Sequence, residues 1–192
     1  MNARERNDLI LSWLSLSVAF ALILSDGLFN FTSFIMAFPI AAVGVGTAFV
    51  FHEMAHRNVA RKFGFYSEYR AWQTGLIFAI LFGLAGIPFA MPGATYILGT
   101  PNRKQNGIIS IAGAVTNIIL GVIFSVLLLL NLGNWLNIIF FYGAYINFIL
   151  AIFNMLPVWL LDGKKVLAWN AGAWAIVFFT AIIGWFVIPI PA

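Results

Sequence analysis

The sequence contains no cysteine and few charged residues, and both absences limit the chemistry that it can perform. Without cysteine there is no disulfide and no thiolate ligand, so a bound metal must be held by histidine, aspartate or glutamate. Only 8% of the 192 residues are charged, whereas soluble domains average about 25%. Because 62% of the residues are hydrophobic, the apolar surface exceeds what one water-exposed core can bury. We therefore expect a polytopic membrane protein that forms a single domain over 1–192.

The apolar residues are grouped into segments that predict the fold class. They lie at 9–24, 34–56, 74–91, 107–130, 136–160 and 166–188. Most of these segments approach the ~20 residues that a helix needs to cross a bilayer. The loops between them are short, and there is no internal repeat or long linker to mark a second domain. The pattern predicts an all-α polytopic membrane protein with five or six transmembrane helices.

The first apolar segment, 9–24, could also be read as a secretory signal peptide, because Arg4 and Arg6 precede it. The segment ends at Ser25 without a clear small-x-small cleavage site. We therefore expect 9–24 to be retained as a peripheral transmembrane helix, and 166–188 to form a second peripheral helix around a core of 34–165.

The basic residues predict the orientation in the membrane, because cytoplasmic loops collect arginine and lysine. All ten would lie on the cytoplasmic side if segment 74–91 entered the membrane and returned to the same side. Glycines and prolines between 83 and 93, followed by β-branched and aromatic residues at 94–100, agree with this path. We therefore predict a re-entrant β-like segment near 83–100. The alternative is an ordinary sixth span with glycine and proline kinks.

Both histidines of the chain lie in the motif "HEMAH" (52–56), at the end of an apolar segment. Residues four apart share one face of a helix, so His52 and His56 can bind one metal ion, with Glu53 beside it. Catalytic zinc takes a third protein ligand. Beyond Glu68, which lies among basic residues and tyrosines, Asp162 is the only carboxylate, and the predicted topology places it at the same membrane face. We therefore predict a Zn²⁺ site formed by His52, His56 and Asp162, with Glu53 as the catalytic residue.

These motifs resemble those of the site-2 protease family of intramembrane zinc metalloproteases. The resemblance covers roughly 34–165 and rests on three stretches, "HEMAH" (52–56), "GIISIAGAVTNIILG" (107–121) and "NMLPVWLLDG" (154–163). The second is similar to the family's Ala-Gly-Pro-x-x-Asn helix, and the third to the Asn-x-x-Pro…Asp-Gly segment that supplies its third zinc ligand. Ala114 stands where the family usually has proline, and Lys164 replaces the second glycine of the common Asp-Gly-Gly.

The resemblance implies a zinc metalloendopeptidase that hydrolyses peptide bonds within or next to transmembrane segments of membrane proteins. A substrate helix must unwind before attack, and an edge strand can pair with its freed backbone. We assign this role to Thr95, Tyr96 and Ile97, and we assign further substrate contacts to Asn154 and Pro157. The expected partners are a substrate helix and the lipid bilayer, without nucleic acid, and homo-oligomerisation is left open. The protein would be a multi-pass protein of the cell membrane with its active site toward the cytoplasm.

The alternative is a membrane metal transporter, or a metal-binding scaffold, that uses the same His/His/Asp site. Transporters often contain internal repeats, which this sequence lacks, and a transporter would have no use for Glu53. Asn117 and Asn147 lie within apolar segments, and we interpret both as residues that join neighbouring helices through hydrogen bonds.

Overall fold

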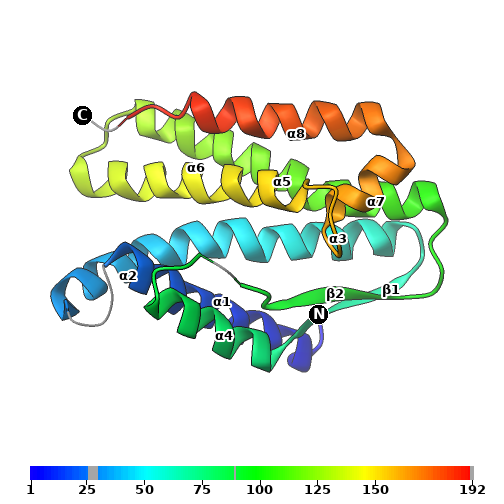
Figure 1. Ribbon diagram of the computed structural model, residues 1–192, viewed down its shortest axis with the longest axis horizontal. Helices are drawn as coiled ribbons and strands as arrows, with labels where there is room; N and C mark the ends of the chain where they lie inside the picture. The colour runs from blue at the N-terminus through cyan, green and yellow to red at the C-terminus, as the bar shows by residue number, and fades with distance from the viewer. Residues whose placement is uncertain (26–29, 89, 191–192) are drawn as a thin grey trace.

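The computed structural model describes residues 1–25, 30–88 and 90–190. In chain order the elements are α1 (Ala3–Leu24), α2 (Phe31–Val45), the π-helical turn η1 (Gly46–Val50), α3 (Phe51–Lys62), β1 (Tyr66–Ala71), α4 (Gln73–Leu84), β2 (Gly93–Leu98), α5 (Arg103–Leu129), α6 (Asn134–Asn154), α7 (Asp162–Trp169) and α8 (Ala171–Phe186). The rod formed by α2, η1 and α3 lies between a layer of α5, α6 and α8 and a layer of α1 and α4 (Figure 1).

Within the described residues, four helical segments are long and apolar enough to cross a membrane. They are Ala3–Leu24, Phe31–Lys62, Arg103–Leu129 and Asn134–Asn154. Helices α4 and α8 are also apolar but shorter. Large apolar side chains, such as Leu129 and Ile176, remain exposed on the outer faces of the helices, as expected where lipid replaces water. These features agree with the predicted helical membrane protein, and the number of spans stays a prediction.

Asparagine side chains define the starts of four of these helices. Asn2, Asn30, Asn102 and Asn170 each accept a hydrogen bond from the backbone N–H three residues later, at the beginnings of α1, α2, α5 and α8. Such caps satisfy N–H groups that have no partner inside the helix. At α5 the side chain of Gln105 also accepts from the backbone N–H of Asn102, which completes a capping box.

The rod of α2, η1 and α3 is one continuous helical segment interrupted by a π-helical turn directly before the "HEMAH" motif. Such turns are frequent at functional sites and leave backbone carbonyls that need other donors. Here the Asn117 amide of α5 donates to Ala48 O within the turn over 2.8 Å, and the Trp13 indole of α1 donates to Ala42 O of α2 over 2.9 Å. These two bonds join the helical rod to α5 and α1 close to the motif.

The two strands form an antiparallel pair in which Tyr66 lies opposite Leu98 and Tyr69 opposite Thr95. The sequence predicts β-like structure near 83–100. Within that range the described residues form a strand only at Gly93–Leu98, since α4 continues to Leu84 and residues 85–88 and 90–92 are in neither a helix nor a strand. Phe89, within the predicted segment, lies outside the described residues. Strand β1 is not predicted from the sequence, because Glu68 lies there among basic residues and tyrosines without an apolar pattern. Whether the segment is re-entrant stays a prediction.

The two last apolar segments are shorter and more divided than the sequence predicts. Helix α6 ends at Asn154 rather than near residue 160, because Pro157 in the following turn lacks the N–H that a helix needs. The predicted helix 166–188 is divided at Asn170, where α7 ends and α8 begins. Gly163 packs against the Met155 carbonyl so closely that a methyl group would collide with it. This turn brings the first residue of α7, Asp162, back toward α3.

Candidate active site

His52 and His56 lie on α3, and both side chains are buried. Nδ1 of His52 lies 2.6 Å from Oδ1 of Asn117, and Nδ1 of His56 lies 2.8 Å from the carbonyl oxygen of Ile109. A carbonyl oxygen only accepts hydrogen bonds, so each Nδ1 carries the proton and each Nε2 keeps its lone pair. The orientation of the Asn117 amide follows from its nitrogen, which donates to Ala48 O and to Asn147 Oδ1. Both imidazoles are thus arranged as metal ligands through Nε2.

Asp162, the first residue of α7, lies opposite these two nitrogens. Its Oδ2 is 2.9 Å from Nε2 of His56 and 3.5 Å from Nε2 of His52. Ligand atoms of a tetrahedral zinc site with bonds near 2.0–2.1 Å are about 3.3 Å apart, and the two separations bracket this value. Two imidazole nitrogens and one carboxylate oxygen are a donor set that suits zinc. The residues present therefore fit a zinc ion with three protein ligands.

Glu53 belongs to the same cluster but faces strand β2. Ligand atoms of His52, Glu53 and His56 all lie within 4.8 Å of one another, so a fourth group could contact the ion. However, Oε2 of Glu53 accepts a hydrogen bond of 2.7 Å from the Thr95 hydroxyl, whereas Oδ2 of Asp162 points at both Nε2 atoms. The geometry therefore favours Asp162 as the third ligand and leaves Glu53 beside the metal position.

Helix α5 approaches α3 closely at the histidines. A methyl group added at Gly113 would lie 2.6 Å from the His52 ring, so only glycine allows this contact without displacement. One turn later on the same helix, Asn117 is fully buried and begins a chain of polar groups. Its amide donates to Asn147 Oδ1 over 3.0 Å, and Asn147 donates to Thr47 Oγ1 over 3.1 Å. The interpretation of Asn117 as a residue that only joins helices is therefore incomplete, because it also orients His52.

Asp162 has a second partner on its outer side. Lys165, one turn further along α7, lies with Nζ 3.1 Å from Asp162 Oδ1. The lysine thus engages the carboxylate oxygen that faces away from the histidines and favours coordination through Oδ2 alone. Sequence reasoning did not single out Lys165, although a cation three residues after a metal-binding carboxylate on a helix is a readable signal.

The site opens into a cavity of about 430 Å³ that is lined mostly by apolar side chains from α3, α5, α6, β2 and the turn before α7. Of the residues predicted to bind substrate, Thr95, Ile97 and Asn154 line this cavity. The Asn154 amide nitrogen donates to Leu150 O of its own helix over 3.1 Å. Pro157 is not part of the lining, although its neighbours Leu156 and Val158 are.

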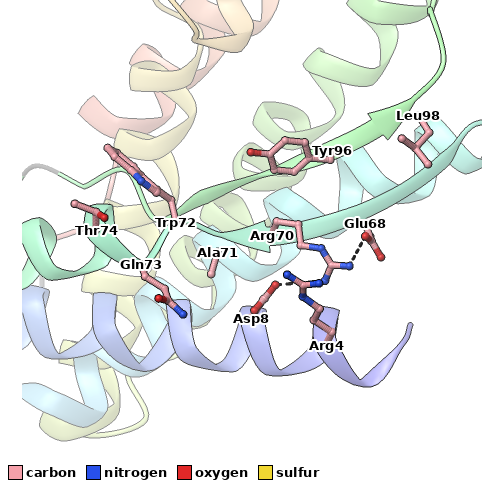
Figure 2. A pocket seen from close by; sticks show the side chains of 10 residues that line it. All are labelled: Arg4, Asp8, Glu68, Arg70, Ala71, Trp72, Gln73, Thr74, Tyr96 and Leu98. Carbon is pink, nitrogen blue, oxygen red and sulfur yellow. Dashed lines mark hydrogen bonds and ion pairs between the residues drawn. The ribbon is translucent and has the colours of Figure 1, made fainter.

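Tyr96 lies on the opposite side of the sheet, because successive strand residues point to opposite faces. There it lines a second hollow of about 680 Å³ between α1, the two strands and the start of α4, as Figure 2 shows. Arg70 pairs there with Glu68 and lies 3.4 Å from Asp8. The Tyr66 hydroxyl and the Asn2 amide each donate to Glu68 over 2.8 Å, and these bonds, the first above all, hold the pKa of Glu68 below its usual range. The charges in this hollow are therefore largely matched among themselves.

One curated protein is closely similar to the chain along most of its length. It comes from Methanocaldococcus jannaschii and is described as a "Putative zinc metalloprotease". The two sequences are 44% identical over 183 residues, which cover 91% of this chain and 88% of the relative. No protein-family model and no solved structure matches the chain. The relative's description and the His-Glu-His group of α3 together support Zn²⁺ as the cofactor. This chain therefore belongs to the same family of zinc metalloproteases.

Proposed function

We propose that the chain is an intramembrane zinc metalloendopeptidase of the site-2 protease type. It would cleave peptide bonds within or next to transmembrane segments of membrane proteins. One observation carries the proposal: the two Nε2 atoms and Asp162 Oδ2 converge beside an apolar cavity among helices of membrane-spanning length. A protease for soluble substrates would gain nothing from a site placed among such helices.

His52, His56 and Asp162 would hold the zinc ion, and Glu53 would act on the attacking water. When bound, zinc supplies Lewis acidity, because it lowers the pKa of a water and polarises the scissile carbonyl. Glu53 takes the proton of that water on its carboxylate and passes it to the nitrogen of the leaving amine. Asn117 and the Ile109 carbonyl keep the two imidazoles in the tautomer that this arrangement needs.

The substrate would bind as an extended segment along strand β2. Strand β1 pairs with one edge of β2, and no other described strand pairs with the second edge. An edge strand can receive an unwound peptide, because its free N–H and C=O groups replace the helical hydrogen bonds that the peptide has lost. Thr95 and Ile97 of β2 and Asn154 of α6 line the cavity, and Pro157 lies between two other lining residues, Leu156 and Val158. Tyr96, on the other face, would support the strand rather than touch the substrate.

The orientation follows from the basic residues next to the site. His56 is followed directly by Arg57, and Asp162 is followed by Lys164 and Lys165. Because arginine and lysine collect on the cytoplasmic side, the site would face the cytoplasm in a multi-pass protein of the cell membrane. Its partners would be a substrate helix and the surrounding lipid, and oligomerisation stays open.

The test uses purified, zinc-loaded protein in liposomes with a fluorogenic transmembrane peptide. We expect Glu53→Gln to keep its zinc and to lose cleavage by about 10²–10⁴-fold, the usual contribution of a general base. Glu68→Gln is the matched control, because it makes the same change at a carboxylate outside the cavity. Normal cleavage by Glu53→Gln would contradict the mechanism. Zinc binding without any cleavage by the wild type would instead favour a metal transporter or scaffold.

A further inference from the structure

Strand β2 places one hydroxyl group directly on the carboxylate of Glu53. Oγ1 of Thr95 lies 2.7 Å from Glu53 Oε2 and 3.2 Å from the Glu53 carbonyl oxygen. A hydroxyl has a single proton, and the shorter contact is the one to the carboxylate, where a charged acceptor strengthens the bond. Among the described residues, no other hydrogen bond to this carboxylate is found. The direction in which Glu53 points is therefore set by Thr95.

Helix α3 alone does not fix this direction. His52 and His56 share one face of the helix, and α5 and α7 hold both rings through Asn117, Ile109 and Asp162. Glu53 follows His52 and so projects about 100° away from that face. Its carboxylate is consequently outside the contacts that hold the histidines. The Glu53 side chain also has several rotatable bonds, so its carboxylate would sample many positions if no partner held it.

Thr95 itself is held by contacts other than those with Glu53. Its cross-strand partner is Tyr69, whose side chain is fully buried. The Tyr69 hydroxyl donates to the Pro92 carbonyl over 2.9 Å and accepts from Ser12 of α1 over 2.9 Å. Its ring packs edge-on against Phe49, with 5.5 Å between the ring centroids. Because Thr95 is β-branched, its χ1 angle is also restricted, so α1 and β1 together hold the hydroxyl in one place.

We propose that Thr95 is a positioning residue that aims the carboxylate of Glu53 at the attacking water. The proposal rests on the proposed function and replaces the substrate contact predicted for Thr95 with a different role. The two roles are distinguishable, because a substrate contact present before and during the reaction raises KM when it is lost, whereas a positioning contact lowers kcat. It also makes the two-stranded sheet part of the catalytic apparatus rather than only a docking edge.

The kinetic test compares Thr95→Val, which removes the hydroxyl and keeps the shape, with Thr95→Ser, which keeps the hydroxyl. For zinc-loaded protein we expect Thr95→Val to lower kcat about 10- to 100-fold with KM within about twofold, since small misplacements of reacting groups cost up to ~10²-fold. Thr95→Ser should retain kcat within about threefold. Thr116→Val is the matched control, because the Thr116 hydroxyl only donates to Ala112 O of its own helix. Zinc content, measured by mass spectrometry, should be the same in all four proteins.

An infrared measurement tests the contact without relying on activity. The sequence contains three glutamates, Glu5, Glu53 and Glu68, and ¹³C labelling of glutamate separates their carboxylate bands from those of aspartate. Glu53→Gln identifies the Glu53 band by removing it. We expect Thr95→Val to shift this band and Thr95→Ser to leave it in place, both in zinc-loaded protein and after zinc removal.

Each result decides the proposal. The proposal is supported if Thr95→Val has a lowered kcat and a shifted carboxylate band, while Thr95→Ser keeps both the kcat and the band of the wild type. Wild-type kcat in Thr95→Val, or a rise in KM without a fall in kcat, would overturn it, and so would equal loss in the serine and valine variants. If the wild type does not cleave at all, the proposed function fails, and the infrared band still decides whether Thr95 holds Glu53.

Discussion

Asp162 Oδ2 lies 2.9 Å from His56 Nε2, although the two residues come from helices α7 and α3, which have about half of the chain between them. The contact depends on the segment between α6 and α7, and on Gly163, whose close approach to the Met155 carbonyl allows α7 to start against that segment. The candidate metal site is therefore assembled by tertiary packing rather than by one local motif.

Asn117→Ala should weaken zinc binding, because it removes the acceptor that orients His52. Loss of such a partner typically costs 10- to 100-fold in metal affinity, and competition with a fluorescent chelator would measure it. Asn137→Ala is the matched control, since Asn137 is also a buried asparagine in a helix but hydrogen-bonds to Asn131 and not to a histidine. Unchanged zinc affinity in Asn117→Ala would show that Asn117 only joins helices.

Gly113→Ala should displace His52, because the added methyl group would lie 2.6 Å from its ring. Overpacking of this kind costs about 1–3 kcal/mol, so we expect reduced zinc occupancy and a lower unfolding temperature in detergent. Gly172→Ala provides the comparison, because a methyl group there would meet only Asn170 Oδ1, at 3.3 Å. If both variants bound zinc equally well, the close approach of α5 would not matter for the site.

Part of this arrangement could be predicted from the sequence, and the reasons for the omissions are physical. Helical spacing puts His52 and His56 on one face, and counting the carboxylates leaves Asp162 as a candidate, so a cluster of three could be predicted without a structure. The contact between Thr95 and Glu53 could not, because it depends on the register of two strands that are joined through α4. Strand β1 was missed because charged residues in "YSEYRA" (66–71) resemble a surface loop when the partner strand is not known.

Glu5→Ala should destabilise the protein strongly. Glu5 on α1 is fully buried, with Oε1 2.6 Å from Nε of the buried Arg57 of α3, although the N–H direction lies outside hydrogen-bond geometry. The same oxygen accepts from the Tyr69 N–H over 3.2 Å. Removing one partner of a buried ion pair leaves an uncompensated charge and costs about 3–5 kcal/mol. Unfolding in a denaturing detergent would measure the change in the free energy of unfolding. A loss no larger than that of Asp8→Ala, at a carboxylate that is partly exposed, would contradict the prediction.

Stability should fall with decreasing pH through the titration of Glu68. Hydrogen bonds from Tyr66 and Asn2, and the charge of Arg70, hold its pKa below the ordinary value of 4.5. A carboxylate with a lowered folded-state pKa stabilises the fold above its unfolded pKa, and this contribution is lost as the pH falls through the folded pKa. Tyr66→Phe should therefore unfold at a lower temperature than the wild type at pH above about 5. This difference in unfolding temperature should vanish in stronger acid. A difference that does not depend on pH would exclude this explanation.

The position of the cut in a membrane substrate shows whether the protein is an intramembrane protease. Zinc-loaded wild-type protein and Glu53→Gln would be reconstituted in liposomes with a single-span substrate, and mass spectrometry would identify the new termini. We expect zinc-dependent cleavage within or next to the apolar segment of the substrate, and no such cleavage by the variant. Cleavage restricted to loops outside the bilayer, or equal cleavage by both proteins, would contradict this expectation.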